Sequence, residues 1–268
     1  GIPARQPDKP TADDEQWLKE CGCELLLVMA YGHLLRDSLL AIPRLPPLNF
    51  HASLLPELRG ASPIDTAIAT GRDTTGITLM RIVKKMDSGA ILDLEKVSIE
   101  AEDNRASLTT KLADACVPLL SRNVPTLLGG ELAFREQDEN AATYCRILDK
   151  DDSNMDFSAS ALELHNRCRA LHLWPGTAFN YQGQRIKVGQ SALSSIVPAS
   201  GTTPGTVLES GFGKDGLHVA TADGVISLLS LQRPGGKMLP ASEFLRGMPI
   251  PSGSILESSP MKPLERIA

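Results

Sequence analysis

Residues 48–64 read LNFHASLLPELRGASPI and place a strand, a turn and a helix start within one short segment. Residues 48–52 have the composition of a strand, and the Leu-Leu-Pro that follows indicates a turn. Ser62 and Pro63 are typical of a helix start, because a capping residue precedes proline at the first helical position. Side chains two residues apart on a strand point to the same side, so Asn49 and His51 should share one face.

The segments around this stretch alternate between strand-like and helix-like patterns. The apolar run ELLLVMAYG (24–32) predicts a buried strand, and TGITLMRIV (75–83) predicts another. Residues 91–100 should return as an antiparallel partner of the second. Helices are expected over residues 11–20, 34–42, 63–70 and 105–130, the last disturbed at Pro118. This alternation predicts a parallel α/β sheet.

The character of the chain changes after residue 130. Residues 131–153 carry many charges and few apolar periods, so we interpret them as a linker. Residues 154–268 begin with a helix that ends at Trp174-Pro175-Gly176 and continue as short strand candidates separated by turn residues. Several short strands within about 100 residues predict a small barrel. We expect the Pro- and Ser-rich tail, residues 249–268, to be loosely held.

The composition is that of an ordinary soluble globular protein, with 42% hydrophobic and 22% charged residues. A net charge of −5 gives no compositional reason to expect nucleic acid, although a local basic face is compatible with it. No apolar run approaches the ~20 residues of a membrane span. The five cysteines are odd in number and form no C-x-x-C pair, which favours free thiols in a reducing cytoplasm and argues against a metal site.

Polar groups follow the predicted strands at the edge where an open α/β sheet binds its ligands. Asn49 and His51 end one strand, and Asp87 follows the next strand in MDSG (86–89). Asp87 would fix the tautomer of His51 and favour its charged form, while His51 and Asn49 aim N–H groups at one oxygen. The sequence shows no obvious activated nucleophile, which favours direct acyl transfer between two bound substrates.

Each member of this cluster also has an ordinary structural interpretation. A lone histidine near a strand end is commonly a hydrogen-bonded structural residue, and a neighbouring asparagine can satisfy loop backbone. Asp87 is by default a turn residue. Leu54-Leu55-Pro56 can be loop packing, and Arg59 can be a solvated charge. The hypothesis of a catalytic site therefore rests on the combination of residues.

Two sets of strings resemble a known family. NFHASLLP, RGASPI and GITLMRIVKKMDSGAIL resemble the folate-dependent formyltransferases, which use 10-formyltetrahydrofolate to formylate an amine. WPGT, PGTVLE and GLHVATADGVISLLSLQ are similar to the C-terminal domain of the members that act on methionyl-tRNA. The resemblance covers the chain from Gly1 to about Gly247. It implies a Rossmann-like formyltransferase domain over residues 1–130, a linker over 131–153 and an OB-like tRNA-binding domain over 154–268.

This resemblance also implies roles for individual residues. Asn49, His51 and Asp87 match the catalytic amide, imidazole and carboxylate of the family. The amine would attack the formyl carbon while Asn49 and His51 hold the oxyanion and Asp87 orients His51. The implied folate contacts are Ser53, Leu54, Leu55, Pro56, Ala30, Tyr31 and Gly32. The implied phosphate contacts to initiator methionyl-tRNA, which can equally be solvated charges, are Arg185, Lys187, Lys214, Arg233 and Lys237.

The chain departs from the family at its beginning. Members of the family open with a strand and a Gly-Thr-Pro-Asp-Phe loop, and neither is found here, so we expect an N-terminally truncated domain. Pro46-Pro47 also stands where many members have a glycine. Three alternatives stay open, namely a formyltransferase for a small amine, such as a purine precursor or an amino sugar, a formyl-folate hydrolase, and an inactive truncated tRNA-binding protein. The expected protein is a cytoplasmic monomer that makes no contact with a membrane.

Overall fold

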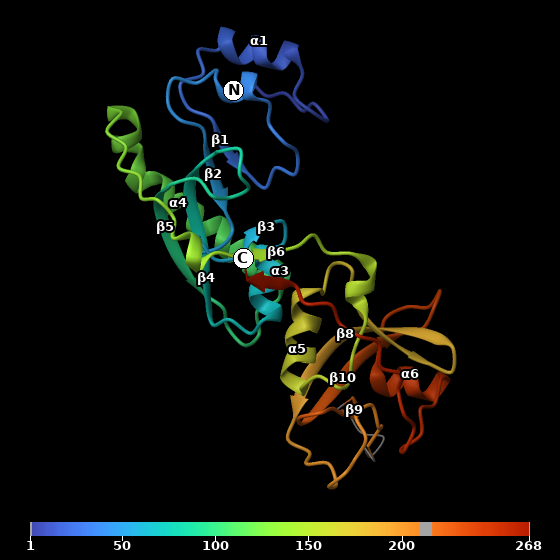
Figure 1. Cartoon of the computed structure of the whole chain (residues 1–268). Coiled ribbons are helices and arrows are strands. Elements are labelled where there is room, and N and C mark those ends of the chain that lie inside the picture. The colour runs from blue at the N-terminus through green and yellow to red at the C-terminus, as the bar shows by residue number, and fades with distance from the viewer. Residues whose placement is uncertain (1, 209–215, 268) are drawn as a thin grey trace.

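The computed structural model describes residues 2–208 and 216–267. Its N-terminal half contains a four-stranded sheet and its C-terminal half an antiparallel sheet, joined by an extended segment (Figure 1). The first sheet has the order β1-β2-β4-β5 and consists of β1 (Leu27–Met29), β2 (Leu48–His51), β4 (Thr74–Arg81) and β5 (Ile91–Ser98). The helices of this half are α1 (Ala12–Glu20), α2 (Asp37–Leu40), α3 (Pro63–Ala69) and α4 (Arg105–Gly129). The predicted α/β class is confirmed.

The first sheet is mixed, whereas the sequence predicts parallel strands before the return of β5. β1 and β2 run parallel, with Val28 opposite Asn49, but β4 runs antiparallel to β2, with Thr78 opposite His51. The predicted antiparallel return of β5 on β4 is confirmed. The direction of β4 differs from the prediction because the chain between β2 and β4 does not cross back to the start of β2, and α3, which lies in this connection, packs against α5 and α4.

The long helix α4 is bounded by its capping residues. The Asn104 side chain accepts hydrogen bonds from backbone N–H groups of the first turn, and Gly130 ends the helix in the left-handed conformation. The helix continues through Pro118, where the sequence predicts a disturbance, because its apolar face is held by buried residues such as Leu108 and Leu119.

Within the described ranges, no helix combines the length and apolar composition needed to cross a membrane.

The C-terminal half forms a circuit of paired segments. The sheet order is β11-β10-β8-β7, with β9 also paired to β10. Glu257 bridges to Asn180 of β7, Ile255 bridges to Thr206, and the next residue, Val207, bridges to Val219 of β9. These pairings connect the two edges of the sheet, as expected for a small barrel. The elements are α5 (Ala161–Ala170), β7 (Thr177–Tyr181), β8 (Gln184–Ser194), β9 (Leu217–Ala220), β10 (Val225–Gln232), β11 (Leu239–Pro240) and α6 (Ala241–Gly247).

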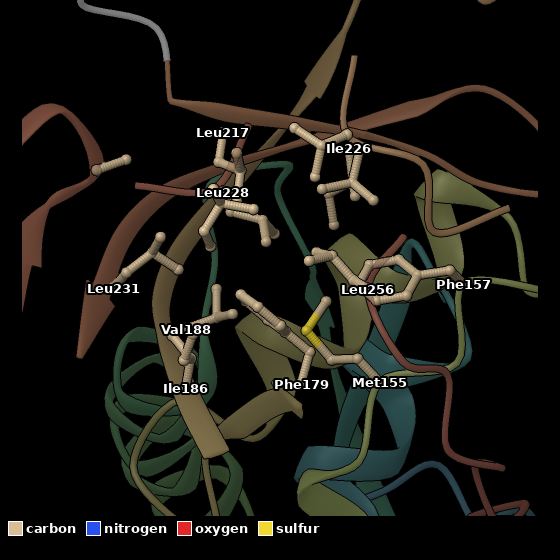
Figure 2. Packing of buried hydrophobic residues seen from close by; sticks show 14 of the residues in the cluster. Met155, Phe157, Phe179, Ile186, Val188, Leu217, Ile226, Leu228, Leu231 and Leu256 are labelled. Carbon is tan, nitrogen blue, oxygen red and sulfur yellow. The ribbon is translucent and has the colours of Figure 1, made fainter. Parts of the chain in front are cut away.

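The interior of this circuit is apolar (Figure 2). Alternate residues of β8 and β10 point inward, since side chains on a strand alternate between its faces. Ile186 on β8 and Leu228 on β10 are fully buried there. Phe157 and Phe179 meet edge to face, with ring centroids 6.3 Å apart. The short strands recognised in the sequence therefore enclose one continuous core.

A three-stranded ribbon lies between the two halves. β6 (Thr143–Cys145), from the predicted linker, pairs parallel with β3 (Arg59–Gly60) and antiparallel with β12 (Glu265–Ile267). The prediction of a loosely held tail is wrong, because β12 is paired and Leu256 and Leu264 are buried. The linker also contains two single-turn helices, η1 (Glu139–Ala141) and η2 (Lys150–Ser153).

The two halves also contact each other directly, through α3 and α5. Ala170 and Leu171, at the end of α5, are fully buried in the apolar cluster of the N-terminal half, which includes Ile68 of α3. Arg169 of α5 donates a hydrogen bond to the backbone carbonyl of Asp103. The halves are therefore packed together by both apolar and polar contacts.

A pair of glycine substitutions tests the packing of the first sheet. A Cβ atom at Gly76 of β4 would lie 2.2 Å from the backbone carbonyl oxygen of Glu95, so Gly76→Ala forces β4 and β5 apart. We expect it to lower the free energy of unfolding by about 1–3 kcal/mol, as overpacking does. At Gly129, at the end of α4, a Cβ would meet nothing within 4 Å, so Gly129→Ala should be neutral or stabilising by up to about 1 kcal/mol. Urea unfolding measures both, and equal effects would contradict this account.

Candidate active site

His51 is the most firmly held of the predicted site residues. It lies at the end of β2 and is 6% exposed. Its Nε2 lies 2.9 Å from the backbone carbonyl oxygen of Leu58. A carbonyl oxygen only accepts hydrogen bonds, so Nε2 carries a proton and Nδ1 is the ring nitrogen that faces the site. The loop after β2 therefore fixes both the orientation and the protonated nitrogen of the imidazole.

Asp87 lies beside this imidazole, as the sequence predicts. Its Oδ2 is 3.7 Å from Nδ1 of His51, which is an ion-pair distance when the ring is charged and too long for a direct hydrogen bond. The same oxygen accepts a hydrogen bond of 2.9 Å from the backbone N–H of Gly60. Asp87 has a left-handed backbone, with φ +48°, which costs an L-residue about 1–2 kcal/mol. Contacts from other parts of the chain must therefore hold the turn at residues 86–89 in this conformation.

Asn49 completes the predicted group from the same strand. It precedes His51 by two residues on β2, so both side chains emerge on one side of the sheet. Asn49 is half-buried, and its amide has no hydrogen-bond partner among the described residues. An amide with two free N–H donors beside a histidine and a carboxylate can stabilise an oxygen on which negative charge develops. The structure thus brings the three predicted catalytic residues to one region.

Arg59 is a site residue that the sequence did not identify. Its pattern in the sequence is compatible with a solvated charge, yet the Arg59 side chain is fully buried. Its guanidinium donates to the side chains of Gln137, Glu139 and Tyr144, all from the linker. Hydrogen bonds from Arg59, followed by those from Lys85, lower the pKa of Glu139 to about 2. A buried guanidinium is stable only when polar or charged groups such as these pair with it. The charged, aperiodic sequence of the linker does not indicate that it supplies such partners.

Two further ionisable groups lie behind the site. Cys145 of β6 accepts a hydrogen bond from the Ser62 backbone N–H, and burial raises the pKa of its thiol to about 11. It is therefore a neutral thiol and a poor nucleophile, in agreement with direct transfer. Asp65 of α3 is 3% exposed, and its Oδ1 lies 3.3 Å from Nε of Arg105. Burial raises the pKa of Asp65 to about 6, and the charge of Arg105 opposes this shift.

The residues predicted to contact folate are placed in two regions. Ser53 is buried and donates to the carbonyl oxygen of Glu57, so its hydroxyl is used inside the loop. Leu55 is buried, whereas Leu54 and Pro56 are half-exposed. Ala30, Tyr31 and Gly32 are exposed after β1, and Tyr31 lines a hollow of about 290 Å³ with Trp17 and Met29. Residues 53–56 do not line this hollow, so the structure does not bring the two predicted segments together there.

The basic residues predicted to contact tRNA also differ in their surroundings. Arg185 donates to the side chains of Ser153 and Asn154 and so ties β8 to the end of the linker. Lys214 lies outside the described residues. The other three are Lys187, Arg233 and Lys237.

These three residues, which we name the basic corner, are exposed on one end of the C-terminal sheet. Lys187 of β8 stands opposite Gln232 of β10, next to Arg233, and Lys237 follows in the turn before β11. No salt bridge to any residue of the described ranges engages the basic corner. Beside it lies a hollow of about 550 Å³, lined by Lys187 together with His172, Gln190 and Met238.

The described residues contain no group of three or more His, Cys, Asp or Glu side chains placed to hold a metal ion.

Comparison with known proteins assigns the family. The formyl transferase family model matches residues 5–124, and the model of the formyl transferase C-terminal domain matches residues 147–249. The chain is 35% identical over 253 residues to a protein of Caldicellulosiruptor saccharolyticus named methionyl-tRNA formyltransferase, covering 94% of this chain and 80% of that relative. The chain belongs to the formyl transferase family.

Further relatives of this formyl transferase agree with the assignment. A Bacillus subtilis protein named methionyl-tRNA formyltransferase is 36% identical over 258 residues, covering 96% of this chain and 80% of the relative. The crystal structure of HypX from Aquifex aeolicus in complex with tetrahydrofolic acid shares the fold, with a TM-score of 0.65 at 14% identity, covering 86% of this chain and 40% of HypX.

The buried carboxylate of Asp65 generates a pH-dependent prediction. Since folding raises the pKa of Asp65 from 3.8 to about 6, the folded state binds its proton more tightly, and the free energy of unfolding falls as pH rises from about 4 to 6. Asp65→Asn should remove this fall and raise the free energy of unfolding at pH 7.5 by about 2–3 kcal/mol.

Urea unfolding between pH 4 and 8 measures this effect. Asp114→Asn is the matched control, because Asp114 is exposed on α4 and its substitution should change the free energy of unfolding by less than about 0.5 kcal/mol. If the free energy of unfolding changes with pH in the same way for the wild type and for Asp65→Asn, the raised pKa of Asp65 is contradicted.

Proposed function

We propose that this chain transfers a formyl group from 10-formyltetrahydrofolate to the α-amine of initiator methionyl-tRNA. The observation that carries the proposal is the pairing of the His51 imidazole with the Asp87 carboxylate at the end of β2, with Asn49 two residues earlier on the same strand and on the same face as His51. The names of the relatives at 35–36% identity support methionyl-tRNA as the acceptor. The tetrahydrofolate bound to HypX supports a folate donor.

The chemistry follows from the fixed positions of these three groups. The amine nitrogen attacks the formyl carbon, and the carbonyl oxygen becomes an oxyanion. Asn49 donates an N–H to this oxygen, while the His51 ring, with Nε2–H on the carbonyl of Leu58, contributes positive charge near it. Asp87 orients and stabilises the charged ring. The bond from carbon to folate N10 then breaks, and the proton lost by the amine passes to N10 through His51 or a water molecule.

Substrate contacts are proposed on both halves of the chain. Tyr31, with its neighbours Ala30 and Gly32, contacts the folate at the hollow after β1. The loop of residues 53–56 lies outside this hollow and makes a second, separate contact with the folate. The basic corner, with Arg185 nearby, contacts tRNA phosphates, because three exposed cations without ion-pair partners among the described residues are free to bind them. We place the catalytic domain at residues 1–130, the linker at 131–153 and an OB-like tRNA-binding domain at 154–268, and we propose a monomer that acts in the cytoplasm.

Substitution of the site residues tests the catalytic assignment. Asn49→Ala and His51→Ala should each lower kcat for formylation of methionyl-tRNA by ~10²–10³, since each removes one group that stabilises the oxyanion. Gln6→Ala, an exposed amide near the N-terminus, is the control and should leave kcat within about twofold. The measurement is transfer of radiolabelled formyl groups to charged initiator tRNA.

Three outcomes would overturn the proposal. Transfer that is indifferent to both substitutions removes the catalytic assignment. Transfer to an amino sugar or a purine precursor but not to methionyl-tRNA favours the small-amine enzyme. Binding of tRNA without transfer favours an inactive binding protein.

The salt dependence of tRNA binding tests the basic corner. Lys187→Ala and Lys237→Ala should each weaken binding and reduce the slope of log K against log salt by about 1, because each removes one phosphate contact. Lys19→Ala, on the exposed face of α1, is the matched control and should leave the slope unchanged. Filter binding between 50 and 300 mM salt measures the slope. The same slope for all three variants would show that the tRNA does not contact the basic corner.

A further inference from the structure

We propose that Gln137, in the linker, is a positioning residue that sets the geometry of the His51–Asp87 pair. The inference rests on the proposed function for the role of that pair. Gln137 touches none of the proposed catalytic side chains, and it acts through two segments that hold them, by contacts to the Arg59 side chain of one and to backbone carbonyls of the other. These segments are residues 58–60, named the β3 loop, and residues 86–89, named the Asp87 turn.

Each segment contributes to the geometry of the His51–Asp87 pair. The β3 loop supplies the Leu58 carbonyl to Nε2 of His51 and the Gly60 N–H to Oδ2 of Asp87. The Asp87 turn places the carboxylate itself. Leu58 and Asp87 both have left-handed backbones, with φ values of +54° and +48°. Non-glycine residues leave this conformation unless surrounding contacts hold it, so the pair depends on an external support.

Gln137 supplies this support with a single side-chain amide. Its Nε2 donates to the backbone carbonyl oxygen of Asp87 at 2.8 Å and to that of Gly89 at 2.7 Å. Its Oε1 accepts from Nε of Arg59 at 3.0 Å and from Nη2 of Arg59 at 2.8 Å. Both donor hydrogens and both acceptor positions of the amide are therefore used. One residue joins the two segments on either side of the pair.

The chemistry of the contact requires an amide. A carboxylate at this position would still accept from Arg59 but would face the carbonyl oxygens of Asp87 and Gly89 without a hydrogen to donate. An ammonium group would donate to the carbonyls but repel the guanidinium. Alanine would leave the buried Arg59 with Glu139 and Tyr144 as its remaining side-chain partners. The carboxylate releases the side toward the Asp87 turn, the ammonium group releases the side toward Arg59, and alanine releases both.

The neighbouring linker residues hold the β3 loop in the same way. Thr143 accepts a hydrogen bond from the Leu58 backbone N–H at 2.9 Å, and β6 pairs with β3. The linker is therefore attached to the β3 loop along its length, while Gln137 alone among the described side chains connects it to the backbone carbonyls of the Asp87 turn. Gln137→Glu therefore separates the effect on the Asp87 turn from the effect on the β3 loop, because a carboxylate still accepts from Arg59 but cannot donate to the turn.

The first arm of the test reads the geometry without any substrate. The amide resonance of Gly60 reports its hydrogen bond to Asp87, and Asp87→Asn defines the resonance expected when that bond is weakened. In NMR spectra of the full chain, Gln137→Glu and Gln137→Ala should move the Gly60 amide toward the Asp87→Asn position and speed its hydrogen exchange at least fivefold. Gln6→Ala should leave it in place. An unmoved Gly60 resonance in folded Gln137 variants would overturn the proposal.

The second arm is a double-mutant cycle on activity. Gln137→Ala should lower kcat about tenfold, with KM for methionyl-tRNA and for the folate donor within about twofold. In the Asp87→Asn background the same substitution should lower kcat less than twofold, because the residue it positions is already impaired. A tenfold loss in both backgrounds, or a rise in KM alone, would overturn the proposal. If the chain transfers no formyl group, the proposed function fails while the Gly60 resonance still decides the role of Gln137.

Discussion

The burial of the Arg59 guanidinium is the constraint on which the arrangement of the site depends. A charge with no exposed surface is tolerated only when its N–H groups meet acceptors, and the N-terminal sheet offers none of those found here. Gln137, Glu139 and Tyr144 come from the segment between the halves, so that segment must lie across the β3 loop. The loop in turn presents a carbonyl to His51 and an N–H to Asp87.

The antiparallel direction of β4 also affects the loop that follows β2. Because β4 runs antiparallel to β2, Thr78 lies opposite His51, and the Thr78 hydroxyl donates to the carbonyl of Ser53. The same hydroxyl accepts from the backbone N–H of Leu55. The loop that follows β2 is thereby held against the middle of β4. In a wholly parallel sheet the C-terminal end of β4 would lie beside the end of β2, and these contacts of Thr78 would not form.

Local pattern predicts much of this fold and of the site. The strands around Asn49 and Asp87, the long helix α4 and the short strands of the second half each leave a signal in composition and spacing. Side-chain period also predicts that Asn49 and His51 share one face, whereas Asp87 reaches His51 through the loop after β4, although β4 runs antiparallel to β2 and not parallel as predicted. Pattern fails where a contact joins distant segments. A charged linker gives no indication that Gln137 meets the turn at Asp87, and a Pro-rich tail gives none that Leu264 packs in the N-terminal core.

The packing of α3 against α5 has a consequence for the choice of substrate. α3 begins just after the β3 loop, and the end of α5 is buried in the apolar cluster that includes Ile68 of α3. This contact holds the region of His51 and the basic corner in one fixed arrangement. A flexible tether would let the two halves adapt to acceptors of any size. A packed contact instead fixes the distance between the proposed catalytic residues and the proposed phosphate contacts, so an RNA that reaches both must have an arm of matching length.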